Sequence, residues 1–356
     1  MSQTFRYGII GTGMMGLEHI ETINHIAGAV VTAYADPHPD SMAAAATLTD
    51  GARGFTDYRA LLSGDLCDAV VIATPNHTHA GVLLDALSTD LHILVEKPLC
   101  TTVEDCRRVV EAARERSSVT WVGLEYRYMP PVARLIREVH EGTVGSVKMV
   151  AIREHRFPFL PKVNDWNRFN RNSGGTLVEK CCHFFDLMNQ ITRAVPVRVM
   201  ASGAQDVNHL DEVYDGAVPD ILDNAFVTVD YDDGSRAMLD LCMFAEATFN
   251  QEEVSVVGDK GKIEALVPEM TVRIGRRGRH FIGDVERYDV GDPRITHQGH
   301  HHGSSQLQHL DFIEACLTGG TPEVGLEDGL LSVAMGIAGQ ISIAEERPVD
   351  MREVLG

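Results

Sequence analysis

Residues 7–16 read YGIIGTGMMG, a short apolar run followed by the pattern Gly-x-Gly-x-x-Gly at Gly11, Gly13 and Gly16. The apolar run predicts a buried strand, and residues 14–27 have the spacing of a helix. A glycine turn at a helix N-terminus presents backbone N–H groups and a partial positive charge, which favour a pyrophosphate. The stretch therefore predicts a dinucleotide site, whose contacts we expect from Gly11, Thr12, Gly13, Met14, Met15 and Gly16.

The residues after this turn alternate between apolar strands and helical patterns. Strands that are apolar throughout are covered on both faces, as in parallel sheets. They are expected at residues 30–35, 69–73, 92–95 and 120–123. With helices between them, they predict a doubly wound α/β domain of the Rossmann type over residues 1–126.

The pattern changes near residue 126 to longer strand-like stretches that end in turns such as Asp232-Asp233-Gly234. It predicts an open, mostly antiparallel sheet, followed by helices at about 304–318 and 326–344. The predicted fold class is therefore α/β plus α+β, with a second domain over residues 127–356. We expect this domain to bind substrate and to form oligomers.

Length and composition agree with two domains and exclude several classes of function. The chain has 356 residues, and its formal net charge of −20 argues against a nucleic-acid groove, which needs a positive field. The sequence contains no apolar run of 18 residues, so no membrane span is predicted. The first residues lack the pattern of a signal peptide, and seven scattered Cys are typical of reduced thiols. We expect a cytoplasmic protein.

Asp36 indicates which dinucleotide would bind. It follows Gly16 by 20 residues at the end of the second predicted strand, where a carboxylate can accept hydrogen bonds from a ribose diol. No Arg follows in residues 37–40 to hold a 2′-phosphate. The sequence therefore favours NAD over NADP.

Two further stretches carry candidate catalytic residues. Lys97, in Glu96-Lys97-Pro98, follows a predicted strand at the sheet edge where α/β proteins bind ligands. Its ammonium could polarise a substrate oxygen. Glu179 and His183 share one face of the helix predicted after Gly174-Gly175, together with Asp186 at the next turn. An imidazole can accept a proton at neutral pH. The alternatives are a surface Lys and a packed structural His.

Taken in order, these motifs resemble the Gfo/Idh/MocA family of oxidoreductases over nearly the whole chain. The resemblance also rests on ATPNHTH at residues 73–79 and on GG-x3-(D/E)-x3-H at residues 174–183. It implies hydride transfer between a nicotinamide and a sugar or polyol carbon, with Lys97, Glu179 and His183 as the catalytic group. It adds contacts to the cofactor from Thr74, Pro75, Asn76, His79, Glu96 and Lys97. An open second sheet of this family often mediates oligomerisation, which suggests a homodimer or homotetramer.

The family most often has Asp at the position of Glu179, and the longer side chain shifts the carboxylate enough to alter the substrate pose. Substrate contacts are expected from Glu179 and His183, and from the polar and aromatic segment that holds Lys162, Trp166 and Arg168. Arg127 either contacts substrate or pins the two domains. The run His300-His301-His302 lacks metal-ligand spacing, so no metal is expected.

Three functions stay open at this level. The first is an NAD-dependent dehydrogenase that acts on a secondary hydroxyl of a sugar, a sugar derivative or an inositol-like polyol. The second is an enzyme of the epimerase, lyase or glycosidase type that retains NAD and has no net redox change. The third is a regulator that senses NAD without catalysis.

Overall fold

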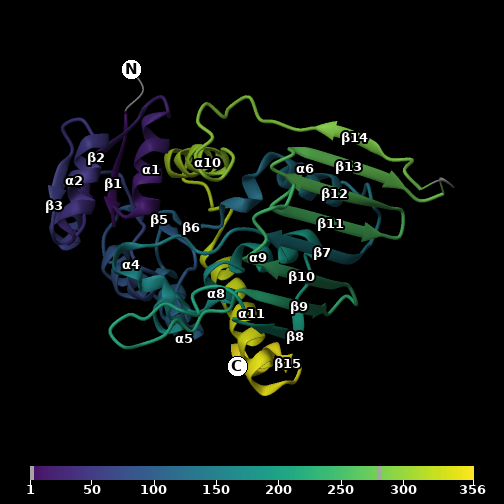
Figure 1. Ribbon diagram of the computed structural model, residues 1–356. Helices are drawn as coiled ribbons and strands as arrows, with labels where there is room; N and C mark the ends of the chain where they lie inside the picture. Colours follow the sequence, from purple (N-terminus) through teal and green to yellow (C-terminus); the bar gives the residue numbers. More distant parts are fainter. Residues whose placement is uncertain (1–3, 279–281) are drawn as a thin grey trace.

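The first sheet is parallel, as the sequence predicts for a doubly wound domain. The computed structural model describes residues 4–278 and 282–356 (Figure 1). Six strands pair in parallel in the order β3-β2-β1-β4-β5-β6. They are β1 (Phe5–Ile10), β2 (Ala29–Ala35), β3 (Arg53–Phe55), β4 (Ala69–Ile72), β5 (His92–Glu96) and β6 (Thr120–Gly123). The Rossmann-type fold is confirmed.

Helices alternate with these strands. They are α1 (Met14–Asn24), α2 (Pro39–Leu48), α3 (Tyr58–Leu62), α4 (His79–Leu87) and α5 (Val103–Ala113), with a 3-10 turn η1 (Asn76–Thr78) before α4. The strand order reverses between β1 and β4, and a crevice for a ligand forms at such a point, beyond the carboxyl ends of the strands.

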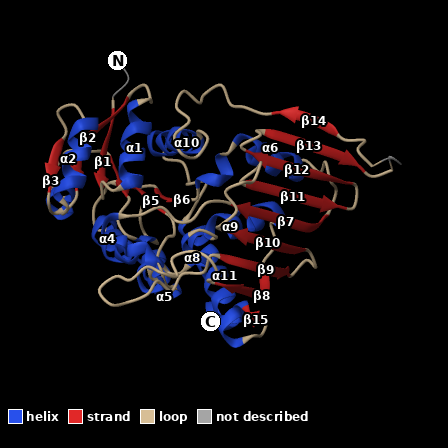
Figure 2. Cartoon of the chain, in the orientation of Figure 1, coloured by secondary structure: helices blue, strands red, loops and turns tan. Residues whose placement is uncertain are grey.

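The second sheet is large and mostly antiparallel, as predicted (Figure 2). Its order is β14-β13-β12-β11-β7-β10-β9-β8-β15, and β7 and β10 are its parallel neighbours. The strands are β7 (Val147–His155), β8 (Pro196–Ala204), β9 (Asn224–Tyr231), β10 (Arg236–Cys242), β11 (Glu252–Gly258), β12 (Gly261–Val267), β13 (Thr271–Arg276), β14 (Glu286–Asp289) and β15 (Val349–Asp350).

The remaining helices all follow β6 in the chain. They are η2 (Glu125–Tyr128), α6 (Pro130–His140), η3 (Val163–Arg168), α7 (Asn170–Ser173), α8 (Thr176–Glu179), α9 (Cys182–Thr192), α10 (Ser304–Thr318), α11 (Leu326–Glu345) and α12 (Met351–Leu355). Both predicted late helices form. Figure 1 shows α11 between the two sheets, and it contacts β6 on one side and β8 on the other.

The core of the first domain is built from both ends of the chain. Leu307 and Phe312 of α10 are buried in the same cluster as Tyr7 and Trp121, and the N–H of Val122 donates to the carbonyl of Val324 at 3.1 Å. α10 lies within residues 127–356, the predicted second domain, and its apolar side chains pack into the core of the first.

Candidate active site

The glycine turn has the geometry that phosphate binding requires. Gly11 has φ +88°, and a Cβ there would lie 2.7 Å from the backbone of Ala73. A Cβ on Gly16 would lie 2.0 Å from the carbonyl oxygen of Gly11, whereas one on Gly13 would meet no atom of the described residues within 4 Å. Gly11 and Gly16 are thus required by close packing, and Gly13 leaves an open cradle at the start of α1.

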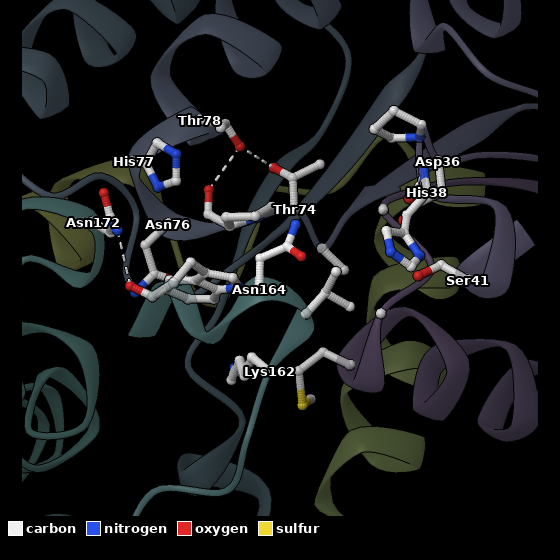
Figure 3. A pocket seen from close by; sticks show the side chains of 18 of the residues that line it. Asp36, His38, Ser41, Thr74, Asn76, His77, Thr78, Lys162, Asn164 and Asn172 are labelled. Atoms are coloured by element: carbon white, nitrogen blue, oxygen red, sulfur yellow. Dashed lines mark hydrogen bonds between the residues drawn. The ribbon is translucent and has the colours of Figure 1, made fainter. Parts of the chain in front are cut away.

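Asp36 is held in place by two backbone donors. Its Oδ2 accepts from the N–H of Thr12 and its Oδ1 from the N–H of His38, both at 2.8 Å. Each carboxylate oxygen keeps further acceptor capacity. Figure 3 shows Asp36, His38 and Ser41 at one end of a cavity. The arrangement fits a ribose diol, so the residues present suit an adenosine half of NAD.

This cavity has a volume of about 1080 Å³, just above the usual range for small-molecule sites. It follows the carboxyl ends of β1, β2, β4 and β5 and continues to residues 161–172 and 214–217. The predicted site residues that line it are Gly11, Gly13, Met14, Met15, Asp36, Thr74, Pro75, Asn76, His79, Glu96, Lys97, Lys162 and Trp166. Thr12 and Gly16 lie behind them.

Hydrogen bonds on the side away from the cavity hold the loop after β4 in place. The His79 ring reaches the carbonyl of Pro98 with Nδ1 at 2.8 Å and that of Thr74 with Nε2 at 2.9 Å. Nδ2 of Asn76 donates to the carbonyl of Ser173 at 3.0 Å. Both nitrogens of His79 are therefore engaged by backbone, and its ring holds the loop in position at the cavity wall.

Lys97 stands at the end of β5 with its ammonium near the second domain. Its Nζ donates to the carbonyl oxygen of Glu179 at 3.2 Å. Burial lowers the pKa of Lys97, but the Cys182 thiol and then Glu179, Glu96 and Glu125 outweigh it, so the net pKa is raised. Lys97 therefore stays an ammonium at neutral pH.

The predicted catalytic helix is interrupted, which corrects the expectation of one continuous face. It ends at Glu179 in α8 and resumes at Cys182 in α9. At the break the N–H of Cys181 bonds to the carbonyl of Thr176, five residues back. The side chain of Lys180 is drawn inward to Glu154 at 2.9 Å and to the hydroxyl of Tyr126. A buried ion pair thus lies at the wide turn.

His183 is buried and neutral at pH 7. Its ring stacks on Tyr126 with centroids 4.0 Å apart, and its Nε2 lies 3.8 Å from Oε1 of Glu125. Burial, followed by the charges of Lys97 and Lys180, lowers the pKa of His183 well below its usual value. Within the described chain its Nδ1 has no hydrogen-bond partner. A neutral imidazole of this kind can accept a proton.

Glu179 faces Lys162 at the end of the cavity that residues 161–172 line. Its Oε1 lies 4.0 Å from Nζ of Lys162, and Oε2 has no hydrogen-bond partner among residues 4–278 and 282–356. Burial raises the pKa of Glu179, although Lys162 and Lys97 oppose it. Glu179 and His183 do not line the main cavity. They lie directly behind Lys97 and Lys162, which do.

Two residues expected near the substrate are engaged by carboxylates of the chain. The guanidinium of Arg127 is buried against the Asp186 carboxylate, and it also reaches Asp328 at 3.2 Å and the carbonyl of Glu323 at 2.9 Å. It therefore ties η2 to α9 and α11. The buried Arg168 donates through Nε to Glu212 at 3.0 Å and lies outside the cavity lining.

The structure adds Tyr214, a residue that sequence reasoning missed. Tyr214 lines the cavity together with Asn164 and Asn172 of the predicted substrate segment, and Lys162, Asn164 and Asn172 are visible in Figure 3. Residues 205–223, which hold Tyr214, carry no strand or helix pattern, and no signal in them pointed to the site. Lys162 lies over the Trp166 ring with Nζ 5.0 Å from its centroid. Together they offer a flat apolar face and a cation.

Comparison with known proteins identifies the family. The sequence profile described as the NAD-binding Rossmann fold of the oxidoreductase family matches residues 5–124, and that of its C-terminal alpha/beta domain matches residues 136–351. The chain belongs to the Gfo/Idh/MocA family of oxidoreductases. It is an NAD-dependent oxidoreductase whose first domain binds NAD.

Similar proteins span the whole chain. Myo-inositol 2-dehydrogenase of Thermotoga maritima is 27% identical, covering 99% of this chain and all of that one. The 2,7-anhydro-N-acetylneuraminate hydratase of Escherichia coli is 24% identical over 98% of each chain. A levoglucosan dehydrogenase solved with NADH and levoglucosan has the same fold, with a TM-score of 0.87 at 21% identity over 98% of this chain and all of that chain.

Neither a metal cluster nor a membrane-spanning helix occurs in the part of the chain that the structure describes. No group of three or more His, Cys, Asp or Glu in the ranges 4–278 and 282–356 is arranged to hold a metal ion. In the same part of the chain, no helix combines the length and apolar character needed to cross a bilayer.

Proposed function

We propose that this protein is a dehydrogenase that uses NAD to oxidise a secondary hydroxyl of a sugar, a sugar derivative or an inositol-like polyol. The main observation behind the proposal is that Lys97 of the first domain contacts the second domain. Its ammonium binds the backbone of Glu179 and lowers the pKa of the neighbouring His183, beside the cavity that Asp36 and Gly13 line. Full-length similarity to a myo-inositol 2-dehydrogenase supports the substrate class.

The chain's residues divide the work of the oxidation. Bound NAD+ supplies the acceptor for the hydride. His183 accepts the hydroxyl proton as the C–O bond becomes a carbonyl, and the Lys97 ammonium stabilises the negative charge that develops on that oxygen. Glu179 and Lys162 hold neighbouring hydroxyls, and Trp166 packs on the C–H face of the ring.

A second candidate keeps NAD bound and has no net redox change. Similarity to the E. coli hydratase over nearly the whole of both chains favours it. The unpaired Oε2 of Glu179 and its raised pKa offer a second proton acceptor, which an elimination next to a transient carbonyl would need.

A substrate panel separates these candidates. Inositols, aldoses and glycosides are incubated with NAD+ and with NADP+, and both reduced cofactor and products are measured. We expect NADH to accumulate with a polyol or sugar, and little NADPH. Product without accumulated NADH would establish the second candidate. Tight NAD binding with no product from any compound would contradict both and favour a regulator.

A further inference from the structure

Behind His183 a row of acidic and imidazole side chains leads away from the cavity. Glu125 begins η2, His301 lies in the loop before α10, and Glu18 belongs to α1. Oε1 of Glu125 lies between two imidazole nitrogens, 3.8 Å from Nε2 of His183 and 3.7 Å from Nε2 of His301. Nδ1 of His301 lies 2.9 Å from Oε1 of Glu18. Four segments that are distant in sequence thus converge.

The exposure of these side chains increases along the row. The side chains of His183 and Glu125 are 2% and 3% exposed, whereas that of His301 is 21% exposed. The row therefore starts at the proposed proton acceptor and ends at a ring that reaches solvent.

Glu125 is not explained by a structural role. Neither of its oxygens has a hydrogen-bond partner in the described part of the chain. A buried carboxyl without partners costs stability, and such groups concentrate at functional sites. Burial raises the pKa of Glu125 to about 7, against the charges of His301 and Lys97. A carboxyl with this pKa exchanges its proton readily at neutral pH.

We propose that Glu125 and His301 carry the substrate proton from His183 to solvent. This inference rests on the proposed function, because it concerns the proton that the oxidation releases. With cofactor and substrate in the cavity, the buried His183 needs another route for this proton. The row behind it supplies that route.

Each transfer moves one proton and no electrons. His183 accepts the hydroxyl proton at one nitrogen and gives up the proton of Nε2 to Oε1 of Glu125. Glu125 passes it to Nε2 of His301, and His301 releases it to water. Both gaps exceed hydrogen-bond length by less than 1 Å, so a small rotation of the Glu125 side chain closes them one at a time. Burial lowers the pKa of His301, but the hydrogen bond to Glu18 and the charges of Glu125 and Glu18 outweigh it, so the pKa is raised. In the neutral ring a proton on Nδ1, facing Glu18, leaves Nε2 as the acceptor.

A second buried chain in the first domain cannot serve as the exit. It runs from Glu96 through His19 and His309 to the hydroxyl of Tyr7, with contacts of 2.8, 2.9 and 3.1 Å. Tyr7 is fully buried, so this chain ends inside the core. Its role is to hold Glu96, which accepts the N–H of Lys97 at 3.2 Å.

The test compares pH profiles of turnover. Besides the row's own members, the charged and titratable groups that face it are Glu96, Lys97, Tyr126, Arg156, Lys180 and Cys182. The carboxylate of Glu125 is the accepting form and is lost as pH falls through about 7. His183, with a pKa far below, stays neutral over that range. We therefore expect the wild-type kcat to fall below pH 7.

Two variants and one control isolate the row. In Glu125→Gln we expect kcat to drop about 100-fold, with KM little changed and the fall near pH 7 gone. In His301→Ala we expect a similar loss that added imidazole restores. His300→Gln, at the exposed neighbouring position, is the control and should keep wild-type kcat. Thermal unfolding and NAD affinity are measured on all three.

The outcomes separate this inference from the proposed function. If the wild type oxidises a substrate while Glu125→Gln keeps its rate and pH profile, the relay is wrong and the dehydrogenase stands. If loss in His301→Ala is not restored by imidazole, the relay is also wrong. If the wild type oxidises nothing in the panel, the relay is tested by the infrared band of the protonated Glu125 carboxyl. A band that titrates near pH 7 and vanishes in Glu125→Gln supports the relay, and its absence overturns it.

Discussion

The charge states of the ionisable side chains at the centre of this molecule depend on burial and on spatial neighbours more than on sequence neighbours. Lys97 keeps its charge because acidic groups surround it, whereas His183 loses its charge because it is buried beside two ammonium groups. The pair is thus a cation next to a neutral base, the combination that polarising and deprotonating one hydroxyl requires.

Lys97 provides a prediction at the scale of one residue. Lys97→Met should reduce kcat at least about 100-fold, because removal of one group that stabilises a developing oxyanion costs about 3–4 kcal/mol. Steady-state kinetics on the substrate found by the panel measures this. The control Lys260→Met changes an exposed lysine and should leave kcat unaltered. A Lys97 variant with wild-type turnover would remove this residue from the mechanism.

At the scale of elements, the glycines of the turn between β1 and α1 have different roles: one is required for packing and another for ligand binding. The third glycine has no room for a methyl group, whereas the second faces open space. The two positions therefore give opposite expectations for the same small substitution.

Gly16→Ala should lower the free energy of unfolding by about 1–3 kcal/mol, because its Cβ would overlap a backbone oxygen that cannot move aside. Gly13→Ala should unfold like the wild type yet bind NAD at least about tenfold more weakly, since the methyl fills the pyrophosphate cradle. Thermal unfolding and NAD titration measure both. Equal NAD affinity in Gly13→Ala and wild type would contradict the cradle.

At the scale of the whole molecule, one face of the large sheet carries exposed apolar side chains. Met149, Met200, Phe226 and Met238 on β7 to β10 are 38–62% exposed. Cross-strand pairs such as Arg198–Asp230 give the face both signs of charge, in a chain whose net charge is −20. We propose that a second copy of the chain covers this face, because a two-fold contact needs a self-complementary surface.

Light scattering after size exclusion tests this proposal. The wild type should elute as a dimer or a larger symmetric oligomer, and Phe226→Glu should shift it toward the monomer, because a buried unpaired charge is costly. Leu317→Glu alters a similarly exposed residue at the end of α10 and should keep the wild-type mass. A wild-type protein that is monomeric at micromolar concentration would contradict the proposal.

The sequence alone was sufficient where the information is local. Strand, turn and helix at residues 7–16, the acid at Asp36 and the alternation of later strands follow from steric limits and from hydrophobic periodicity over a few residues. These determined the Rossmann-type domain, the antiparallel second domain and the preference for NAD.

Only the tertiary structure determined the contact partners of the polar side chains. The pairing of Arg127 with Asp186, the break between α8 and α9 at Lys180, and the alignment of Glu125 with His301 join residues 26 to 176 positions apart. No local pattern encodes such contacts, because they arise when separately folded segments bury charged groups together and each must find a partner in a medium of low dielectric constant.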